Sequence, residues 1–216
     1  QTKGARMNTL FEAHDLCKRY GDITALRLPY FSMEKGETVA LTGRNGSGKS
    51  TLLRLLAFLE KPTSGSLLYA GNQTDPRREV TLLLQEPYLM KASVFWNVTL
   101  GLRLRGLDAE RQRKGYRESM LAVGFADPDG MATRGPGELS GGERQRIALA
   151  SRLILSPSVL LLDEPTSNVD AASEKAILNV VRTLRSRGVS IVCATHDRDI
   201  PAALEAREVS IVNERP

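Results

Sequence analysis

The sequence predicts an α/β protein, because buried strands and helices alternate along most of the chain. An apolar run at 38–42 is followed by a glycine-rich turn and an apolar helix at 52–59. Further continuous apolar runs, typical of strands buried on both faces, occupy 80–84, 158–163 and 189–194. From about 90 to 137 the pattern is helical without strand-like alternation, which predicts an inserted helical part.

Length and composition are those of an ordinary globular protein. The 216 residues are enough for one large domain with a core, and the net charge of +5 is spread without a dense block of Lys and Arg. We therefore expect a solvated, mildly basic surface and no nucleic-acid partner. Cys17 and Cys193 lie far apart in the sequence, each in an apolar-leaning stretch, so we expect buried small hydrophobes rather than a disulfide or a metal-binding pair.

Targeting signals are missing from the sequence. It contains no signal peptide and no apolar run approaching a membrane span, so we expect a cytosolic protein whose membrane role is peripheral. Residues 1–6 precede Met7 and are expected to be a cloning remnant, with Met7 the native start.

The first segment, 8–33, mixes β-forming residues with two turn signals, which predicts two or three antiparallel strands. Tyr20 lies beside the first turn, well upstream of the glycine-rich loop. Its ring could stack on an adenine base, or it could be a packed strand tyrosine; its position leaves both open.

The glycine-rich loop has the spacing G-x-x-x-x-G-K-S between a buried strand and a buried helix, which is the context of a phosphate-binding loop. Glycines let bare N–H groups approach phosphate oxygens, and the helix N-terminus points at the same place. Lys49 can reach the β- and γ-phosphates, and the Ser50 hydroxyl can ligate Mg²⁺. The predicted nucleotide-binding residues are Gly43, Arg44, Asn45, Gly46, Ser47, Gly48, Lys49, Ser50 and Thr51.

Beyond this loop, strands are expected at 66–70 and 80–84. Gln85 follows the second strand directly; it could coordinate Mg²⁺ or hold a water, or be an ordinary loop glutamine. In the helical part, Ser93 is expected to cap a helix at 94–100 and Asp108 a helix at 109–123.

A second glycine pair opens the next helix. Ser140 and Glu143 form a Ser-x-x-Glu capping box around Gly141 and Gly142. The box alone is a sufficient explanation, but two glycines in a first helical turn also suit a helix end that a ligand approaches closely.

The strand at 158–163 ends in two acids. Neighbouring strand side chains point to opposite faces, so Asp163 and Glu164 are expected to do different work. Asp163 is suited to bind Mg²⁺. Glu164 is expected to be extended because Pro165 follows it, and it could accept a proton from an attacking water or only orient that water.

After a polar turn come a helix near 172–184, a strand at 189–194 and His196, which could donate a hydrogen bond to a γ-phosphate. A helix near 201–206 and a strand at 208–212 close the chain.

Taken together from 8 to 212, these residues resemble the nucleotide-binding subunit of an ATP-binding cassette (ABC) transporter. The most specific part is the ordered set of phosphate loop, Leu139-Ser140-Gly141-Gly142-Glu143, and Leu160 to Pro165. The resemblance implies that Tyr20 stacks on adenine, that Gln85, Glu164 and His196 are catalytic, and that Ser50, Gln85 and Asp163 bind Mg²⁺. Ser167 and Asp170 fit the family's D-loop, whereas the interior Asn168-Val169 departs from the usual small apolar pair.

The resemblance also implies the architecture and the partners. It implies a RecA-like P-loop NTPase core with an antiparallel β-subdomain, 8–84 and 138–212, and a helical subdomain, 85–137. ATP would hold a head-to-tail homodimer in which 139–143 of one subunit complete the site of the other. Permease subunits, docking at 88–98, and a substrate-binding protein are implied if the chain serves an importer at the inner membrane face, loosely of the tungstate or molybdate type. The alternative is an ABC ATPase that acts on nucleic acid, ribosomes or membranes without transport.

Overall fold

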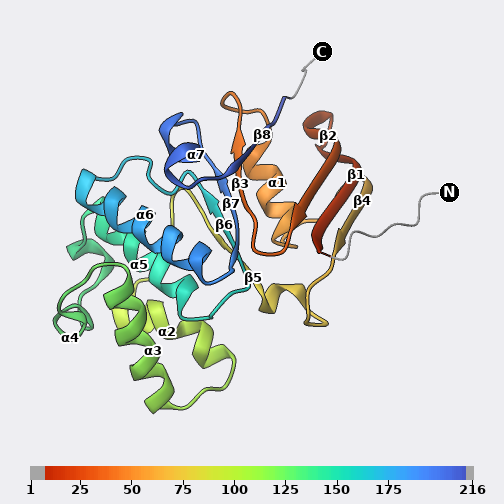
Figure 1. The fold of residues 1–216 in the computed structure, drawn as a ribbon. Helices are drawn as coiled ribbons and strands as arrows, with labels where there is room; N and C mark the ends of the chain where they lie inside the picture. The colour runs from red at the N-terminus through yellow and green to blue at the C-terminus, as the bar shows by residue number, and fades with distance from the viewer. Residues whose placement is uncertain (1–7, 213–216) are drawn as a thin grey trace. The chain divides into compact units, whose positions relative to one another are not determined.

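The structure is a computed structural model and describes residues 8–212 (Figure 1). Its contacts divide this range into two compact units. The first comprises the residues up to Leu82, Ser158–Glu164 and the residues from Leu184 on; the second comprises Leu83–Pro157 and Pro165–Thr183. The expected cloning remnant, 1–6, and Met7 lie outside the described residues.

An antiparallel sheet of three strands opens the first unit. Its order is β2-β1-β4, with β1 at Thr9–Tyr20, β2 at Ile23–Glu34 and β4 at Ser64–Tyr69. Gly21, with φ of +57°, allows the tight turn between the first two strands. The antiparallel strands predicted for 8–33 are therefore confirmed.

A five-stranded sheet forms the other half of this unit, in the order β5-β6-β7-β3-β8. β6 pairs with β7, β7 with β3 and β3 with β8, and each of these pairs is parallel. The carboxyl ends of β3, β6 and β7 consequently meet at one edge. The strands are β3 Thr38–Thr42, β5 Val80–Leu83, β6 Val159–Asp163, β7 Ser190–Ala194 and β8 Arg207–Ser210.

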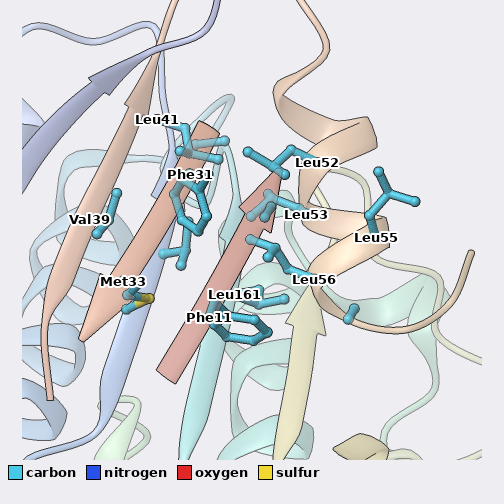
Figure 2. Close-up of a cluster of buried hydrophobic side chains, with 14 of the residues drawn as sticks. Phe11, Phe31, Met33, Val39, Leu41, Leu52, Leu53, Leu55, Leu56 and Leu161 are labelled. Atoms are coloured by element: carbon cyan, nitrogen blue, oxygen red, sulfur yellow. The ribbon is translucent and has the colours of Figure 1, made fainter. Parts of the chain in front are cut away.

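Helix α1, Lys49–Leu56, packs against strands of both sheets. Figure 2 shows Leu52, Leu53 and Leu56 on the side of the helix that faces Phe11 of the antiparallel sheet and Leu161 of the parallel sheet, whereas Leu55 points the other way. Leu52, Leu53 and Phe11 are fully buried, and burying a leucine or phenylalanine side chain contributes about 1.5–3 kcal/mol. This core fixes the helix whose first turn carries the phosphate loop.

The second unit is helical. Helix α2, Val94–Leu104, packs against α3, Ala109–Ala122, and against α5, Gly141–Leu153. Ser93 accepts a hydrogen bond from the N–H of Trp96, and Asp108 accepts one from the N–H of Arg111, which confirms both predicted caps. The unit also contains α4 Pro128–Met131, the 3₁₀ turn Pro136–Glu138 and, as far as Thr183, α6 Ala171–Ser186. By its contacts this unit also takes in α5 and most of α6. The helical subdomain at 85–137 stays a prediction.

Some element boundaries differ from the expectation. Helix α1 begins at Lys49 and stops at Leu56, because Phe58 takes a φ of +56° and turns the chain. The last helix, α7, spans Asp199–Ala203, since Pro201 is tolerated only in a first helical turn. The last strand is β8, Arg207–Ser210. Another 3₁₀ turn, Pro76–Arg78, precedes β5.

Both cysteines are free thiols: Cys193 is buried, as expected, and Cys17 is partly exposed. Among residues 8–212, no helix combines the length and the apolar character needed to cross a membrane.

Candidate nucleotide site

The loop after β3 requires glycine for two separate reasons. Gly43, Gly46 and Gly48 have φ of +142°, +78° and +103°, which L side chains rarely adopt. A Cβ on Gly43 would also collide with the carbonyl oxygen of Ile211. The backbone therefore turns tightly and exposes N–H groups next to the start of α1, which is the geometry of an anion site.

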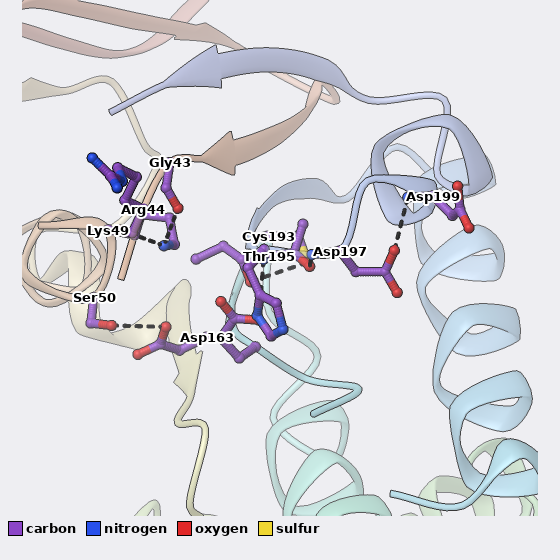
Figure 3. A network of polar contacts seen from close by, with 12 residues as sticks. Gly43, Arg44, Lys49, Ser50, Asp163, Cys193, Thr195, Asp197 and Asp199 are labelled. Atoms are coloured by element: carbon purple, nitrogen blue, oxygen red, sulfur yellow. Dashed lines mark hydrogen bonds and ion pairs between the residues drawn. The ribbon is translucent and has the colours of Figure 1, made fainter. Parts of the chain in front are cut away.

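Lys49 closes this loop on itself. Its side chain is 6% exposed, and Nζ donates to the carbonyl oxygens of Gly43 at 2.8 Å and Arg44 at 3.3 Å (Figure 3). Within the described range, the buried Oγ of Ser47 has no hydrogen-bond partner. The loop thus holds an ammonium group and a hydroxyl beside its bare N–H groups.

Ser50 and Asp163 meet across the sheet edge. Ser50 Oγ donates to Asp163 Oδ1 at 3.0 Å, so the first turn of α1 contacts the end of β6 (Figure 3). Burial is the main cause that raises the pKa of Asp163, and the hydrogen bond from Ser50 opposes this rise. A hydroxyl and a buried carboxylate at this distance are oxygen donors that fit Mg²⁺.

Glu164 and His196 form a second pair at the same edge. His196 Nδ1 lies 2.8 Å from Glu164 Oε2. The Glu164 side chain is 10% exposed and that of His196 is 62% exposed. The carboxylate is therefore held by a partner that solvent and ligands can reach.

The expected extended conformation of Glu164 is wrong. Its φ is +47°, in the left-handed region, and its N–H donates to the carbonyl oxygen of Ala194 at 2.9 Å. The bond to β7 continues the strand pairing one residue past β6, and the left-handed turn then redirects the chain. A non-glycine residue in a sparsely populated region costs on the order of 1–3 kcal/mol and often marks a functional position.

Short hydrogen bonds order the segment after β7. The N–H of Asp197 donates to Thr195 Oγ1 at 3.1 Å, and the N–H of Asp199 donates to Asp197 Oδ1 at 2.9 Å (Figure 3). The N–H of Thr195 donates to the carbonyl oxygen of Leu41 at 3.1 Å. His196 thus lies on a backbone fixed on both sides.

Tyr20 ends β1 and is 44% exposed, so it is not a packed core tyrosine. Its hydroxyl donates to Glu60, and Lys18 lies over its ring. Sequence reasoning missed both partners. No local signal reveals Glu60, because 40 residues separate it from Tyr20.

The remaining predicted residues belong to the helical unit. Gln85 is exposed in a bend after β5. The capping box at α5 is confirmed: the N–H of Glu143 donates to Ser140 Oγ at 3.2 Å, and the N–H of Ser140 donates to Glu143 Oε2 at 2.8 Å. Leu139 is buried and anchors the turn through its carbonyl oxygen, which accepts from Arg144 at 3.0 Å.

The start of α5 contacts the turn that leads into α6. A Cβ on Gly142 would collide with Ser173 Oγ and Asp170 Oδ2, whereas Gly141 has room. Asp170 accepts hydrogen bonds from the N–H of Ser173 at 2.9 Å and from its hydroxyl at 2.8 Å. These bonds lower the pKa of Asp170. Ser167 lies in the turn before it.

Comparison with known proteins assigns the family. The family model described as ABC transporter matches residues 26–167, about two thirds of the chain. The chain belongs to the ABC transporter family. This range contains the phosphate loop, Ser140 to Glu143 and the Asp163-Glu164 pair described above.

Relatives of this ABC chain include two proteins named Fe(3+) ions import ATP-binding proteins. FbpC 1 of Rhizobium meliloti is 39% identical over 199 residues, covering 89% of this chain and 56% of the relative. FbpC of Vibrio cholerae serotype O1 is 37% identical over 190 residues, covering 85% and 53%. The ABC chain thus spans about half the length of these relatives.

Solved structures share the fold of this ABC chain. A dimeric post-hydrolysis state of the ATP-binding cassette MJ0796, bound to ADP and Pi, superposes with a TM-score of 0.84 at 27% identity, covering 95% of this chain and 97% of that one. CbiO1 from Clostridium perfringens, part of the ABC transporter complex cbiONQ, has a TM-score of 0.80 at 28% identity, covering 95% and 85%. The predicted mixed α/β class with parallel and antiparallel sheets is confirmed.

Proposed function

We propose that this chain is the ATP-binding and ATP-hydrolysing subunit of an importer, in which closure of a dimer on ATP, followed by hydrolysis, drives a membrane permease. One observation carries the proposal. A single sheet edge holds the lysine-bearing loop, the Ser50–Asp163 pair and the Glu164–His196 pair. The names of the iron-importing relatives support the import direction.

Phosphate binding uses groups already directed into the loop. The N–H of Ser47 donates to the carbonyl oxygen of Arg44 at 3.1 Å; the other N–H groups of the loop and the start of α1 offer donors and a positive dipole end to the phosphates. Lys49 Nζ is held by two loop carbonyl oxygens, and its free hydrogen can donate to the β- and γ-phosphate oxygens. The exposed ring of Tyr20 receives the adenine base.

Ser50 and Asp163 are the proposed magnesium ligands, with Gln85 as a further one. When Mg²⁺ is bound with ATP, it neutralises the charge that develops on the β- and γ-phosphates. Asp163 is suited to the role because it is buried at a strand end and already paired with the Ser50 hydroxyl.

Hydrolysis depends on Glu164 and His196. Glu164 accepts the proton of the attacking water or, as the alternative, only orients that water. His196 lies against the carboxylate through Nδ1, and its ring is exposed. In the imidazolium form both ring nitrogens carry hydrogen, so Nδ1–H can hold the carboxylate while Nε2–H donates to the γ-phosphate.

The second half of each site comes from a partner copy of this chain in a head-to-tail dimer. The start of α5, with Ser140, Gly141 and Gly142, presents N–H groups to the γ-phosphate bound by the other subunit. Ser167 and Asp170 connect the two sites through the turn before α6. Asn168 has a φ of +57°, which asparagine tolerates better than most residues, so the departure at 168–169 keeps the turn.

The permease contact is proposed at 88–98. A depression of ≈ 490 Å³ on the helical unit is lined there by Tyr88, Leu89, Lys91 and Ala92, and also by 135–137. Tyr88 is 80% exposed, and a large exposed aromatic residue suits a protein contact. We therefore place the subunit peripherally on the inner face of the membrane, with a substrate-binding protein on the outer side. The oxyanion substrate stays a prediction, and the relatives' names favour ferric iron instead.

Two measurements test the proposal. Purified chain should release phosphate from ATP only when Mg²⁺ is present. A tagged chain isolated from membranes should retain a permease, and Tyr88→Ala should weaken that association. Salt-sensitive binding to DNA or RNA, without a permease, would favour the non-transport alternative.

A further inference from the structure

The place of Tyr20 follows from strand pairing. A Cβ on Gly48 would lie 2.7 Å from the carbonyl oxygen of Ala25, so the phosphate loop touches β2 at that residue. Tyr20 pairs with Ile23, two residues along β2 from Ala25. Two strand residues span about 7 Å, so β1 ends at Tyr20 close to the place where β2 meets the phosphate loop.

Charged side chains surround this ring, and one of them, Arg54, also hydrogen-bonds the side chain of Tyr20. The Tyr20 hydroxyl donates to Glu60 Oε2 at 2.5 Å, and Lys18 Nζ lies 5.0 Å from the ring centroid. Lys18 and Glu60 also pair with each other at 3.0 Å. Lys18 covers one face of the ring; within residues 8–212 no other aromatic ring stacks on Tyr20.

The backbone around Glu60 is tied to the end of β1. Thr63 donates its N–H to the carbonyl oxygen of Cys17 at 2.8 Å, and Arg19 donates its N–H to Thr63 Oγ1 at 3.0 Å. Lys18 Nζ reaches the carbonyl oxygen of Lys61 at 3.0 Å. The side chains of Lys18 and Glu60 are only 16% and 23% exposed. Glu60 is therefore a fixed group rather than a mobile surface carboxylate.

We propose that Glu60 and Lys18 are positioning residues that hold the Tyr20 ring so that the nucleobase stacks on the face opposite Lys18. The inference rests on the proposed function, since it requires the loop to bind a nucleoside triphosphate. A ring already fixed by two partners loses less freedom when a base stacks on it, so the pair increases affinity for the base-bearing nucleotide. The hydrogen bond from Tyr20 also lowers the pKa of Glu60, which keeps the acceptor ionised.

Calorimetric titration of the full chain with ATP and with inorganic tripolyphosphate, both with Mg²⁺, tests the proposal. Glu60→Ala and Tyr20→Phe should each raise the Kd for ATP about 3- to 10-fold and leave the Kd for tripolyphosphate unchanged. Their double variant should lose less affinity than the two single losses combined, because both changes remove the Tyr20–Glu60 hydrogen bond and only the remaining contacts of each residue add. Glu60→Gln, which keeps an acceptor, should restore ATP affinity to within about twofold.

The control is Tyr30→Phe, since Tyr30 is a 54% exposed tyrosine on the same sheet; it should change neither Kd. Equal losses for ATP and tripolyphosphate, or no loss for Tyr20→Phe, would overturn the positioning role. If Glu60→Ala fails to fold, the Kd values of Tyr20→Phe for ATP and tripolyphosphate still test the positioning role. If the unaltered chain binds neither ligand, the proposed function fails instead, and the two failures are distinguished.

Discussion

The Nδ1 atom of His196 lies 2.8 Å from Oε2 of Glu164, and the backbone N–H of His196 approaches the same oxygen at 3.4 Å. The two residues follow the ends of the neighbouring parallel strands β6 and β7. One carboxylate oxygen is therefore held by a ring and by a backbone that is itself fixed. Such a pair should behave as one functional unit.

Glu164→Gln should preserve ATP binding and stop turnover. The amide keeps the shape of the side chain but cannot accept a proton, so phosphate release should fall by about 100-fold or more. The ATP-bound dimer should accumulate on gel filtration, because hydrolysis no longer releases it. The matched control, Glu110→Gln on the exposed side of α3, should leave both properties unchanged. Normal turnover in the Glu164 variant would disprove the assignment of the base.

His196→Ala should slow turnover and should not add to the loss in Glu164→Gln. Alanine removes the partner that orients the carboxylate, so the single change should lower kcat by at least about tenfold. In a double-mutant cycle the two losses should be strongly non-additive, because the residues act together. Simple multiplication of the two effects would indicate that the 2.8 Å contact is irrelevant to hydrolysis.

Lys49→Ala should weaken both the ligand site and the loop. Loss of a charged donor to the phosphates should raise the Kd for ATP by roughly 30-fold or more. The two carbonyl oxygens that accept from Nζ lose their partner, so the nucleotide-free protein should lose about 1–3 kcal/mol of stability. Calorimetry and urea unfolding measure the two effects separately. Lys35→Ala, an exposed lysine of the same unit, should show neither.

The buried strands could be predicted from the sequence because each is a continuous apolar run. The phosphate loop could be predicted because its nine residues are contiguous. The residues meeting at the sheet edge were predictable as strand ends. Their direct pairing was not, since Glu164 and His196 are 32 residues apart. The conformation of Glu164 was mispredicted because local sterics before proline favour an extended backbone, and the hydrogen bond to Ala194 overrides them. The contact between Glu60 and Tyr20 could not be predicted either, because it forms only where the segment 60–63 is hydrogen-bonded to the end of β1.

Gly141 and Gly142 should separate folding from turnover. In Gly142→Ala the new Cβ collides with Ser173 and Asp170, so the free energy of unfolding should fall by about 1–3 kcal/mol. In Gly141→Ala the nearest atom is the carbonyl oxygen of Asn168 at 3.7 Å, an ordinary contact, so stability should not fall. Turnover should still drop in Gly141→Ala if a γ-phosphate approaches this helix end. Unchanged turnover in that variant would argue against a ligand there.

Asp163→Asn should stabilise the metal-free protein at neutral pH while abolishing turnover. Burial is the main cause that raises the pKa of Asp163. The folded protein therefore binds a proton on the Asp163 carboxyl group more tightly than the unfolded chain does. Proton binding thus stabilises the fold in acid, and this stabilisation is lost as the pH rises through the folded-state pKa of Asp163. Above it, the ionised carboxylate disfavours folding. Asparagine removes this cost and still accepts from Ser50, so the unfolding midpoint should rise by roughly 2–4 °C at pH 7.

The gain in Asp163→Asn should shrink as the pH is lowered through the folded-state pKa of Asp163, because the folded protein then carries the carboxyl group protonated and the cost of burying its charge is gone. Thermal unfolding without nucleotide or Mg²⁺, measured at a series of pH values, records this trend. Asp22→Asn supplies the control, since Asp22 is a fully exposed turn residue whose replacement should not move the midpoint at any pH. A gain that is independent of pH, or a loss of stability at pH 7, would show that the buried charge of Asp163 does not destabilise the fold. A gain that shrinks at low pH instead fits a carboxylate that is kept for its ligand at the expense of stability.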